Sequence, residues 1–533
     1  MATITATPGA LPAGPGTVEK ASLTTWIAIL AGMVGAFMAI LNIQITNASL
    51  LDIEGGIGTG VDNGAWISTS YLIGEIVVIP LTSYLSRVFS FRAYMIGSTF
   101  FFAIFSMACA FASNLGEMIA MRGLQGFAGG VLIPMAFTMV ATRLPKAQQP
   151  TGLAMFALSV TFAPAIGPTI GGYLTENYGW QTIFFINTVP AALMIVALYF
   201  TLERAKPQFN LLREGDWLGI FTMAIGLSAL QTLLEEGNKE DWFESTFVVK
   251  LAVVAAVFLT AFIWIQLTIK KPLVDLRLLL NRNFGIGTLA NVLVGFALFG
   301  SVYILPQYLG QVQGYNAEQI GQVLAWTGLP QLLLIPLVPL MMRHFDVRYI
   351  GVLGIGLFAA SCFMNMHMSL DYSGDQFFVP NIVRAIGQAM VITPLTAIAT
   401  LGIAQKDAAN ASGLFNMLRN LGGAVGTAAL GTIITKREQF HSNIIGQSVT
   451  TSREEVRDRI ATMTDYFMAH GMSDHAAAQK QAIIMLGKTV KRQALVMGFS
   501  DTFAVIGVML AIAAVLLLFA KKGNPGGGAA GAH

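Results

Sequence analysis

Apolar runs long enough to cross a lipid bilayer recur along almost the whole chain of 533 residues. A bilayer core of about 30 Å requires about 20 apolar residues in an α-helix. Hydrophobic residues make up 55% of the chain, charged residues only 11%, and the mean hydropathy is +0.66. We therefore predict an all-α membrane protein with about fourteen transmembrane helices, at 24–46, 63–85, 93–112, 117–141, 150–174, 181–202, 216–236, 247–269, 284–309, 318–342, 348–368, 376–402, 409–434 and 497–520.

The loops between these runs alternate in charge. Because short basic loops stay in the cytoplasm, this alternation predicts an even number of spans with both termini in the cytoplasm. The basic loops follow even-numbered runs and hold Arg87, Arg92, Arg143, Lys146, Arg204, Lys206, Arg213, Lys270, Lys271, Arg277, Arg282, Arg343, Arg348, Lys521 and Lys522. The acidic loops hold Asp52, Glu54, Asp62, Glu117, Glu176, Glu235, Glu236, Glu240, Asp241, Asp371 and Asp375.

No pattern typical of a catalytic or metal site occurs in the sequence. The two cysteines, Cys109 and Cys362, lie in separate apolar runs, and the six histidines are scattered, so neither a disulfide framework nor a metal site is indicated. The lack of a P-loop disfavours an ATP-driven pump. We expect no enzymatic activity, no metal and no cofactor.

Two distant segments resemble each other and indicate an internal repeat. "RGLQGFAGGVLIPMA" begins at Arg122 and "RAIGQAMVITPLTA" at Arg384; both place an arginine early in an apolar helix and a proline after it. The next helices open alike, with "TGLAMF" and "SGLFNM". Such a repeat is typical of the major facilitator fold, here two six-helix bundles with two extra helices between them.

The repeat predicts a division of the chain into five parts. These are a disordered cytoplasmic tail (1–22), an N-terminal six-helix bundle (23–202), two inserted linker helices (203–283), a C-terminal six-helix bundle (284–520) and a flexible cytoplasmic tail (521–533).

The C-terminal bundle contains one long loop, 435–496, which falls on the outer, periplasmic side. Apolar residues at Ile460, Met463 and Phe467, and again at Ala482, Ile483 and Leu486, predict two short amphipathic helices. The loop is either a hairpin packed on the helix ends or a docking surface for another protein.

Among the charged residues within the predicted spans, four are placed deep enough to matter in a bilayer: Glu75, Arg122, Arg384 and Arg419. Charge is costly in a bilayer, so such side chains face a cavity or a partner. Glu75 is the one carboxylate deep in the first bundle, and burial would let it exchange protons near neutral pH. For the arginines, a structural pairing and a role in transport remain equally open.

Uncharged polar residues mark candidate faces of a substrate cavity. Residues four apart share a face of a helix, and polar groups in a bilayer need partners, which a neighbouring helix or a substrate would supply. The predicted cavity set is Asn42, Gln44, Thr46, Asn47, Gln125, Tyr303, Gln307, Arg384, Gln388, Asn416, Arg419 and Asn420.

The fifth run contains "APAIGPTIGGYL", with prolines and glycines four residues apart. Small residues at this spacing let helices approach closely, and prolines bend a helix. The stretch is either a packing seam or a seam that slides or seals during transport, and neither interpretation excludes the other.

Taken together, these motifs resemble those of the fourteen-helix drug:proton antiporters of the major facilitator superfamily, EmrB type. The resemblance covers nearly the whole chain and includes "GAWISTSYLIGEIVVIPLT", "GPTIGGYLTENYGWQTIFFINTVP" and "DWLGIFTMAIGLSALQTLLEEGNKEDWF". It implies a role in proton coupling for Arg122, beside Glu75, and an antiporter motif formed by Pro164, Gly167, Pro168, Gly171 and Gly172.

The chain departs from the family pattern at two places. The loop after the second run reads "TSYLSRVFSFR", with Ser83 and Ser90 where glycine is common, although Arg87 and Arg92 keep this cytoplasmic gating loop basic. In the first run, "LNIQITNASLL" has Asn42 where the family has an acid. An amide cannot titrate, so coupling must then rest elsewhere or involve fewer protons.

The resemblance implies proton-driven efflux of hydrophobic or amphiphilic compounds across a bacterial inner membrane by alternating access. It also implies a tripartite system with a periplasmic membrane-fusion adaptor and an outer-membrane channel, and no nucleic-acid partner. Because the first-run acid and the loop glycines are lost, a second hypothesis is a membrane sensor or regulator that no longer transports.

Overall fold

The computed structural model describes residues 21–522 except 60, 146, 270, 271, 405 and 406. Most of the two predicted tails and the basic residues Lys146, Lys270 and Lys271 lie outside the described residues.

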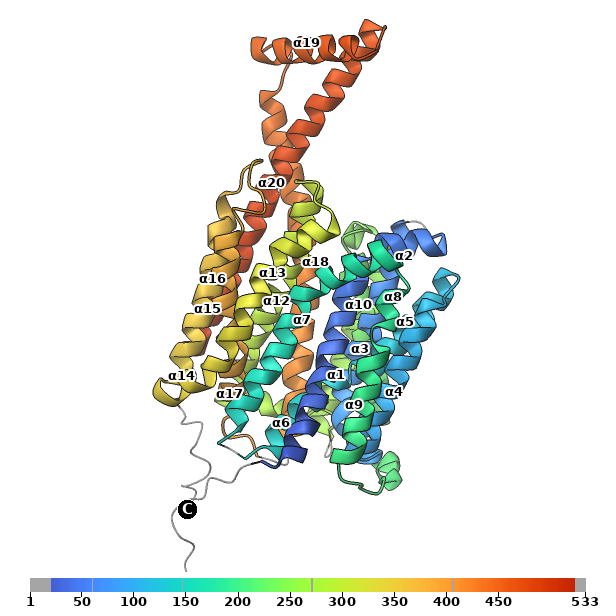
Figure 1. Cartoon of the computed structure of the whole chain (residues 1–533), viewed down its shortest axis with the longest axis vertical. Coiled ribbons are helices and arrows are strands. Elements are labelled where there is room, and N and C mark those ends of the chain that lie inside the picture. The colour runs from blue at the N-terminus through green and yellow to red at the C-terminus, as the bar shows by residue number, and fades with distance from the viewer. Residues whose placement is uncertain (1–20, 60, 146, 270–271, 405–406, 523–533) are drawn as a thin grey trace, which may run out of the picture.

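Each of the fourteen predicted spans corresponds to one helix or to a broken helix, and the described residues contain no strand (Figure 1). The predicted fold class is thus confirmed. The helices are α1 (Leu23–Ala48), α2 (Leu50–Ile57), α3 (Val61–Val88), α4 (Phe91–Ala110), α5 (Leu115–Gly129), α6 (Leu132–Arg143), α7 (Gln149–Tyr178), α8 (Thr182–Phe185), α9 (Thr188–Thr201), α10 (Trp217–Glu236), α11 (Thr246–Thr268), α12 (Arg282–Gln311), α13 (Ala317–Leu334), α14 (Val338–His344), α15 (Val347–Met364), α16 (Phe378–Ala389), α17 (Ile392–Ala399), α18 (Ala408–Ser448), α19 (Glu454–Ala469) and α20 (His475–Leu518).

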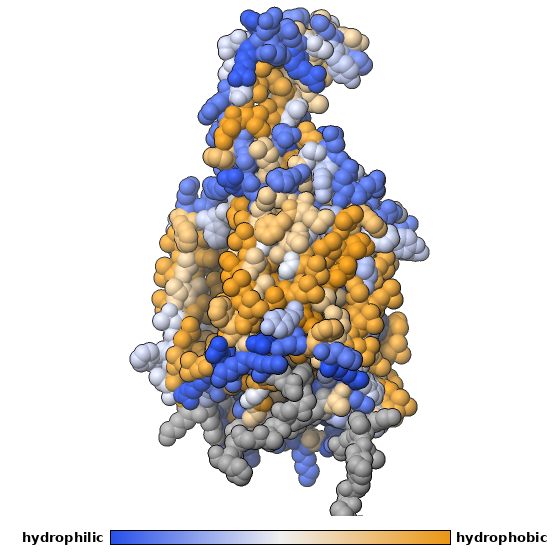
Figure 2. Space-filling view, turned by 90° about the vertical axis from the view of Figure 1, so that its left-hand side faces the viewer, coloured by the Kyte–Doolittle hydropathy of each residue, from blue (hydrophilic) through white to orange (hydrophobic). Residues whose placement is uncertain are grey.

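Most of these helices could cross a membrane by length and composition. In the described part of the chain, 12 helices meet that standard, or 13 with the bent helix α7. The remaining predicted span, 409–434, lies in α18, whose apolar portion is interrupted by Arg419 and Asn420. Figure 2 shows the matching surface, a broad apolar belt between two polar ends. The protein is therefore a multi-pass membrane protein.

The two repeated segments fold alike. The first is broken between α5 and α6, and the second between α16 and α17, each time ahead of the repeated proline. α5 packs against α3 and α4, as α16 packs against α13 and α15. α6 packs against α1, as α17 packs against α12. The sequence repeat is therefore also a structural repeat.

The two repeats meet along two seams. α7 packs against α13, and α3 packs against α18. Of the two inserted helices, α10 packs against α3 and α18, whereas α11 contacts mainly α10. Apolar residues between 28 and 202 form one buried cluster, and those of the second repeat form another that also includes residues of α3 and α10. The division into domains stays a prediction.

The long loop 435–496 differs from its prediction. α18 continues without a break to Ser448 and α20 begins at His475, so the two spans themselves form a stalk above the bundle (Figure 1). The predicted helix around Ile460 is present as α19, which crosses the top of the stalk. The predicted short helix at 482–486 is wrong, because this segment is the first part of the 44-residue α20. Helix formation is cooperative, so an existing helix extends more readily than a new one begins.

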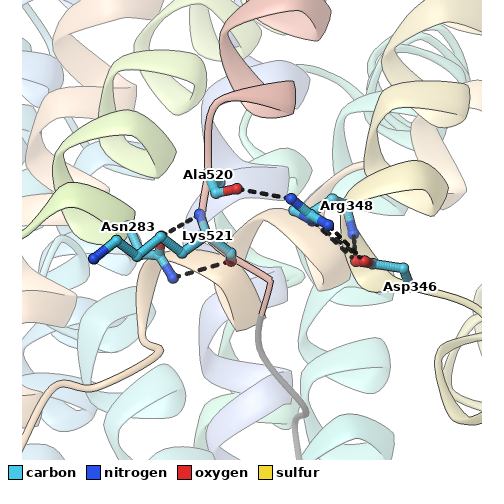
Figure 3. Close-up of polar contacts among 5 residues, drawn as sticks. All are labelled: Asn283, Asp346, Arg348, Ala520 and Lys521. Carbon is cyan, nitrogen blue, oxygen red and sulfur yellow. Dashed lines mark hydrogen bonds and ion pairs between the residues drawn. The ribbon is translucent and has the colours of Figure 1, made fainter.

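The end of α20 is fastened to the second repeat by polar contacts (Figure 3). Asn283 exchanges two hydrogen bonds with the backbone of Lys521, at 2.8 and 3.4 Å. Arg348 donates to the backbone oxygen of Ala520 at 3.0 Å and pairs with Asp346 at 2.8 Å. The bonds from Arg348 also hold the pKa of Asp346 below its usual value.

The predicted gating loop after α3 does not connect the halves through its arginines. Arg87 donates to the oxygen of Ser83 in its own helix, and Arg92 donates to the oxygen of Leu202 in the same half. The contact that crosses to α18 is neutral, from the Ser83 hydroxyl to Asn410 Oδ1 at 2.6 Å. The loop thus lacks a charged link between the halves within the described residues.

Ser90 explains why glycine is common at its position in the resembled family. Its φ is +70°, a region that costs a residue with a side chain about 1 kcal/mol or more. Its hydroxyl partly offsets this cost by accepting from the Ala93 N–H at 3.4 Å, as the N-cap of α4.

We expect Ser90→Gly to raise the free energy of unfolding by about 0.5–1 kcal/mol, because glycine adopts this φ without strain while losing only a weak cap. The measurement is thermal unfolding of the purified protein in detergent. Ser86→Gly, in the last turns of α3 where φ is helical, is the matched control and should be destabilising. Equal destabilisation by both changes would contradict the account.

Candidate functional site

A close approach of α3 and α5 builds the polar centre of the first half. A Cβ on Gly74 would collide with the backbone of Gly123 and Phe127, and one on Gly126 would collide with the backbone of Tyr71. The glycines of "RGLQGFAGG" therefore let α3 lie directly on α5. This contact brings Tyr71 and Glu75 of α3 beside Arg122 of α5.

Arg122 is fully buried and is held by neutral oxygen atoms. It donates to Asn42 Oδ1 at 2.5 Å, to Gln125 Oε1 at 2.8 Å and to the backbone oxygen of Ile67 at 3.2 Å. Its guanidinium lies 4.4 Å from the centre of the Tyr71 ring, a favourable arrangement for a desolvated cation. No carboxylate in the described part of the chain lies within 4.0 Å of it.

The other predicted polar residues of α1 serve different purposes. Thr46 bonds back to the oxygen of Asn42 at 2.8 Å, within its own helix. Asn47 accepts from the Ser68 hydroxyl of α3 at 2.6 Å. Gln44 is buried against Gly167 of α7. Of these residues, Asn47 hydrogen-bonds to another helix, Gln44 packs against one, and Thr46 bonds within α1.

Glu75 lies on the seam between the halves. Its side chain is 4% exposed, and Oε1 accepts from Asn420 Nδ2 of α18 at 3.2 Å. Its Oε2 has no hydrogen-bond partner among the described residues. Two cations act on it electrostatically, Arg419 from the second half and Arg122 from the first. A buried carboxyl group thus sits where its charge is felt by both halves.

The second half repeats the arginine without its full set of partners. Arg384 is buried beside Phe358, with its guanidinium 5.6 Å from the ring, and has no carboxylate within 4.0 Å in the described chain. Gln388 accepts from Gln331 at 3.0 Å, but its own Nε2 is unpaired. Unpaired buried polar atoms are costly unless a ligand or water meets them.

The remaining predicted cavity residues are spread along α12 and α18. Asn416 donates to the oxygen of Ser412 in α18 at 2.9 Å, and the Nε of Arg419 has no partner among the residues described. Tyr303 is 37% exposed, and a Cβ on Gly431 would lie 3.4 Å from its hydroxyl. Tyr303 and Gln307 therefore lie apart from the Arg122 cluster.

The glycines of the predicted antiporter motif pack against α1. A Cβ on Gly167 would collide with Gln44, and one on Gly171 would lie 3.0 Å from the oxygen of Ile45. α7 bends by 44° between its segments Gln149–Pro164 and Ile166–Tyr178. Pro168 and Gly172 are buried in the second segment. The motif thus forms a close seam with α1 and places a bend in a helix that also contacts the second half.

The model of the major facilitator superfamily matches residues 32–427. The chain belongs to the major facilitator superfamily. The superfamily consists of transporters and not of enzymes.

Two relatives of known name indicate which type of major facilitator protein this chain resembles. The superfamily member described here is 33% identical over 501 residues to the colistin resistance protein EmrB of Acinetobacter baumannii, covering 94% of this chain and 97% of that protein. It is 30% identical over 511 residues to the multidrug export protein EmrB of Escherichia coli, covering 95% and 98%. The predicted EmrB-type resemblance is confirmed.

Solved structures support the fold of this transporter. The proton:xylose symporter XylE matches with a TM-score of 0.60 at 13% identity, covering 94% of this chain and 96% of that chain. The human organic anion transporter MFSD10 matches with a TM-score of 0.55 at 13% identity, covering 91% and 99%.

Sequence reasoning assigned three carboxyl groups of this transporter to acidic loops, although two of them are buried and the third, Glu235, is half-buried. Glu54 is 4% exposed in α2, against Gly64, and burial raises its pKa. Glu235 and Glu236 form the last turn of α10, and Glu236 is 3% exposed. The sequence offered one sign that Glu235 and Glu236 belong to a helix and not to a loop, because they directly follow the apolar run of α10.

We expect Asn42→Asp to change proton coupling, because it would place a carboxylate in hydrogen-bonding contact with Arg122 and form a buried ion pair. The measurement is the external-pH dependence of dye efflux from cells or vesicles. Thr46→Ser, which keeps its bond within α1, is the control. Unchanged coupling in the aspartate variant would place Asn42 outside the proton path.

Proposed function

We propose that the protein is a proton-driven exporter of hydrophobic or amphiphilic compounds that works by alternating access in a bacterial inner membrane. The observation that carries the proposal is Glu75, a buried carboxyl group on the α3–α18 seam that accepts a hydrogen bond from Asn420 of the second half and lies within the electrostatic reach of arginines from both halves. The names of the relatives, multidrug export protein and colistin resistance protein, support an exporter.

In this proposal Glu75 links proton binding to movement of the halves. The charged form attracts Arg419 and accepts from Asn420, which holds α3 against α18. A proton removes that attraction and turns Oε2 into a donor in need of an acceptor. Protonation of Glu75 therefore weakens the contact between α3 and α18, whereas the charged form strengthens it. A ligand, here the proton, shifts the equilibrium between two conformations only when it binds one of them more tightly.

Arg122 acts through Glu75 in this proposal. Its bonds to Asn42 and Gln125 are to neutral groups, so its positive charge is not neutralised locally. It therefore favours the charged form of Glu75 and helps the proton to leave. Asn42 fixes the orientation of Arg122 without carrying a proton.

The second half supplies the recognition of anionic, amphiphilic substrates in this proposal. The buried guanidinium groups of Arg384 and Arg419 have no carboxylate within 4.0 Å in the described chain. An anionic group with an apolar body would pair with one of them and bury its remainder among aliphatic and aromatic side chains. One relative, of Neisseria gonorrhoeae, is named a fatty acid resistance protein.

The proposal places both termini in the cytoplasm and the α18–α19–α20 stalk in the periplasm, where it serves as the docking surface of a membrane-fusion adaptor that leads to an outer-membrane channel. Figure 2 shows apolar side chains on the surface of the stalk. Phe440 and Ile444 of α18 and Met485 of α20 are among the exposed apolar residues of its two helices. Exposed apolar patches of this kind are typical of protein interfaces.

We expect Glu75→Gln to lower gradient-driven efflux of a lipophilic dye by about tenfold or more, which corresponds to about 1.4 kcal/mol. The glutamine keeps the size of the side chain and its bond from Asn420 but cannot bind a proton. The measurement is efflux from proteoliposomes with and without an imposed pH gradient.

Glu176→Gln, at an exposed end of α7, is the matched control and should transport like the parent. Gradient-driven efflux by Glu75→Gln at the parent rate would remove Glu75 from the coupling mechanism. Dye binding by the parent without any gradient-driven flux would favour the alternative, a sensor of the same fold that no longer transports.

The docking proposal is tested by photo-crosslinking in cells. We expect a crosslinking amino acid at Phe440, Ile444 or Met485 to capture a periplasmic membrane-fusion protein. The same amino acid at Leu280, 86% exposed at the opposite end of the bundle, should not. Capture from Leu280 alone, or no adaptor captured from the stalk, would contradict the proposal.

A further inference from the structure

The inserted helix α10 ends in two carboxyl groups that the coupling mechanism does not use. α10 runs from Trp217 to Glu236 and packs against both α3 and α18, the two helices that carry the Glu75–Asn420 contact. Its last turn therefore lies beside the seam between the halves, at the end of the bundle that bears the stalk.

Glu236 is buried without a full set of partners. It is 3% exposed, and its Oε2 lies 3.5 Å from Lys239 Nζ. Its Oε1 has no hydrogen-bond partner in the described part of the chain. A buried, incompletely paired carboxylate is costly unless a ligand, water or cation meets it.

Glu235 adds a second acidic group to the same turn. Its Oε1 accepts from Gln231 Nε2 at 3.0 Å, a neutral partner. An electrostatic interaction couples Glu235 with Glu236. Two neighbouring carboxyl groups in an apolar setting take up their protons in separate steps, because charge on one opposes charge on the other.

Side chains from other elements surround this turn. Tyr303 of α12 interacts electrostatically with Glu235, and its hydroxyl and the amide of Asn238 both approach Gly431 of α18. Trp242 fixes the chain after α10 to α18 by donating to Thr432 at 2.8 Å. Tyr303 is 37% exposed, so neighbouring helices do not fully cover this side of the turn.

Few charges balance the pair. Lys239 is the nearest cation, on the segment that follows α10. Lys250 on the neighbouring helix α11 and Glu240 are exposed, while α12 presents the neutral Tyr303 and α18 the neutral Gly431 and Thr432. α3 carries titratable groups, among them Tyr71 and Glu75. The turn therefore carries excess negative charge.

Two residues with hydroxyl groups precede this turn on the same face of α10. Ser228, Thr232 and Glu236 are spaced by four residues and so share one face of α10. Ser228 and Thr232 line a groove between α10 and α3 together with Val77, two residues beyond Glu75. The Thr232 hydroxyl donates to the backbone oxygen of Ser228 at 2.9 Å, and these two residues are the polar members of an otherwise apolar groove.

We propose that Glu235 and Glu236 form a second proton-binding site, at the outer end of the inserted helix α10, which collects protons before they reach Glu75. This proposal rests on the proposed proton-driven export. It assigns a role to the insertion itself, because neither six-helix repeat contains the pair.

The test compares proton binding and transport in Glu235→Gln, Glu236→Gln and the double variant, with Glu240→Gln as the matched control. Glu240 is an exposed glutamate four residues beyond Glu236 that accepts from Ser245 at 2.9 Å. Infrared difference spectroscopy of the purified protein, between mildly alkaline and mildly acidic pH, reports the carbonyl band of each carboxyl group that binds a proton.

We expect the double variant to lose carbonyl intensity that Glu240→Gln and Glu75→Gln retain. In proteoliposomes its dye efflux should require about tenfold more external protons than the parent, a shift of about one pH unit toward acid. Glu75→Gln should instead lower gradient-driven flux by about tenfold or more at every external pH while keeping the pair's carbonyl band.

Carbonyl intensity and a pH profile in the double variant that match those of Glu240→Gln would overturn the proposal. If the parent shows no gradient-driven flux, the proposed function fails, while the carbonyl band still decides whether the pair binds a proton. The single glutamine variants keep side-chain size, and they resolve the outcome if the double variant does not fold.

Discussion

The solvation of Arg122 by the protein itself is the constraint on which the first half depends. A guanidinium in an apolar bundle loses its water and must recover that free energy from protein oxygen atoms. Here the oxygens come from Asn42 on α1, Gln125 on α5 and the backbone of α3. Three helices must therefore meet at one point, and the glycines along α3 and α5 make that meeting sterically feasible.

The two repeats treat the same arginine differently. Arg122 has three oxygen acceptors, whereas Arg384 in the equivalent helix lacks a partner for its Nε in the described chain. One half is thus satisfied internally and the other leaves polar atoms for a ligand or water. Duplication supplied one scaffold twice, and the two copies now differ in how completely their centres are paired.

Sequence reasoning recovered the spans, because a bilayer imposes the same length and hydropathy on each of them. It found the repeat through local similarity alone. It was less successful at helix ends: it predicted a short helix at 482–486, but polar residues there continue α20 into the stalk. It also counted Glu235 and Glu236 as loop acids, because composition does not show which side of a helix end is covered by neighbouring helices.

For the candidate site too, the sequence predicted some features and left others to the tertiary structure. Residue type and spacing identified Asn42, Glu75, Arg122 and Asn420 as unusual within apolar helices, since charge and amides in such helices demand partners. Which partner each one meets depends on how helices distant in the chain pack together. Only the tertiary structure decided that Arg122 bonds to Asn42 and that Glu75 reaches across the seam to Asn420. The sequence by itself determined a multi-pass helical protein of duplicated halves, because hydropathy and repetition are local properties. Pairing is not local, because it depends on contacts between helices far apart in the chain, 80 residues for Arg122 and Asn42 and 345 for Glu75 and Asn420.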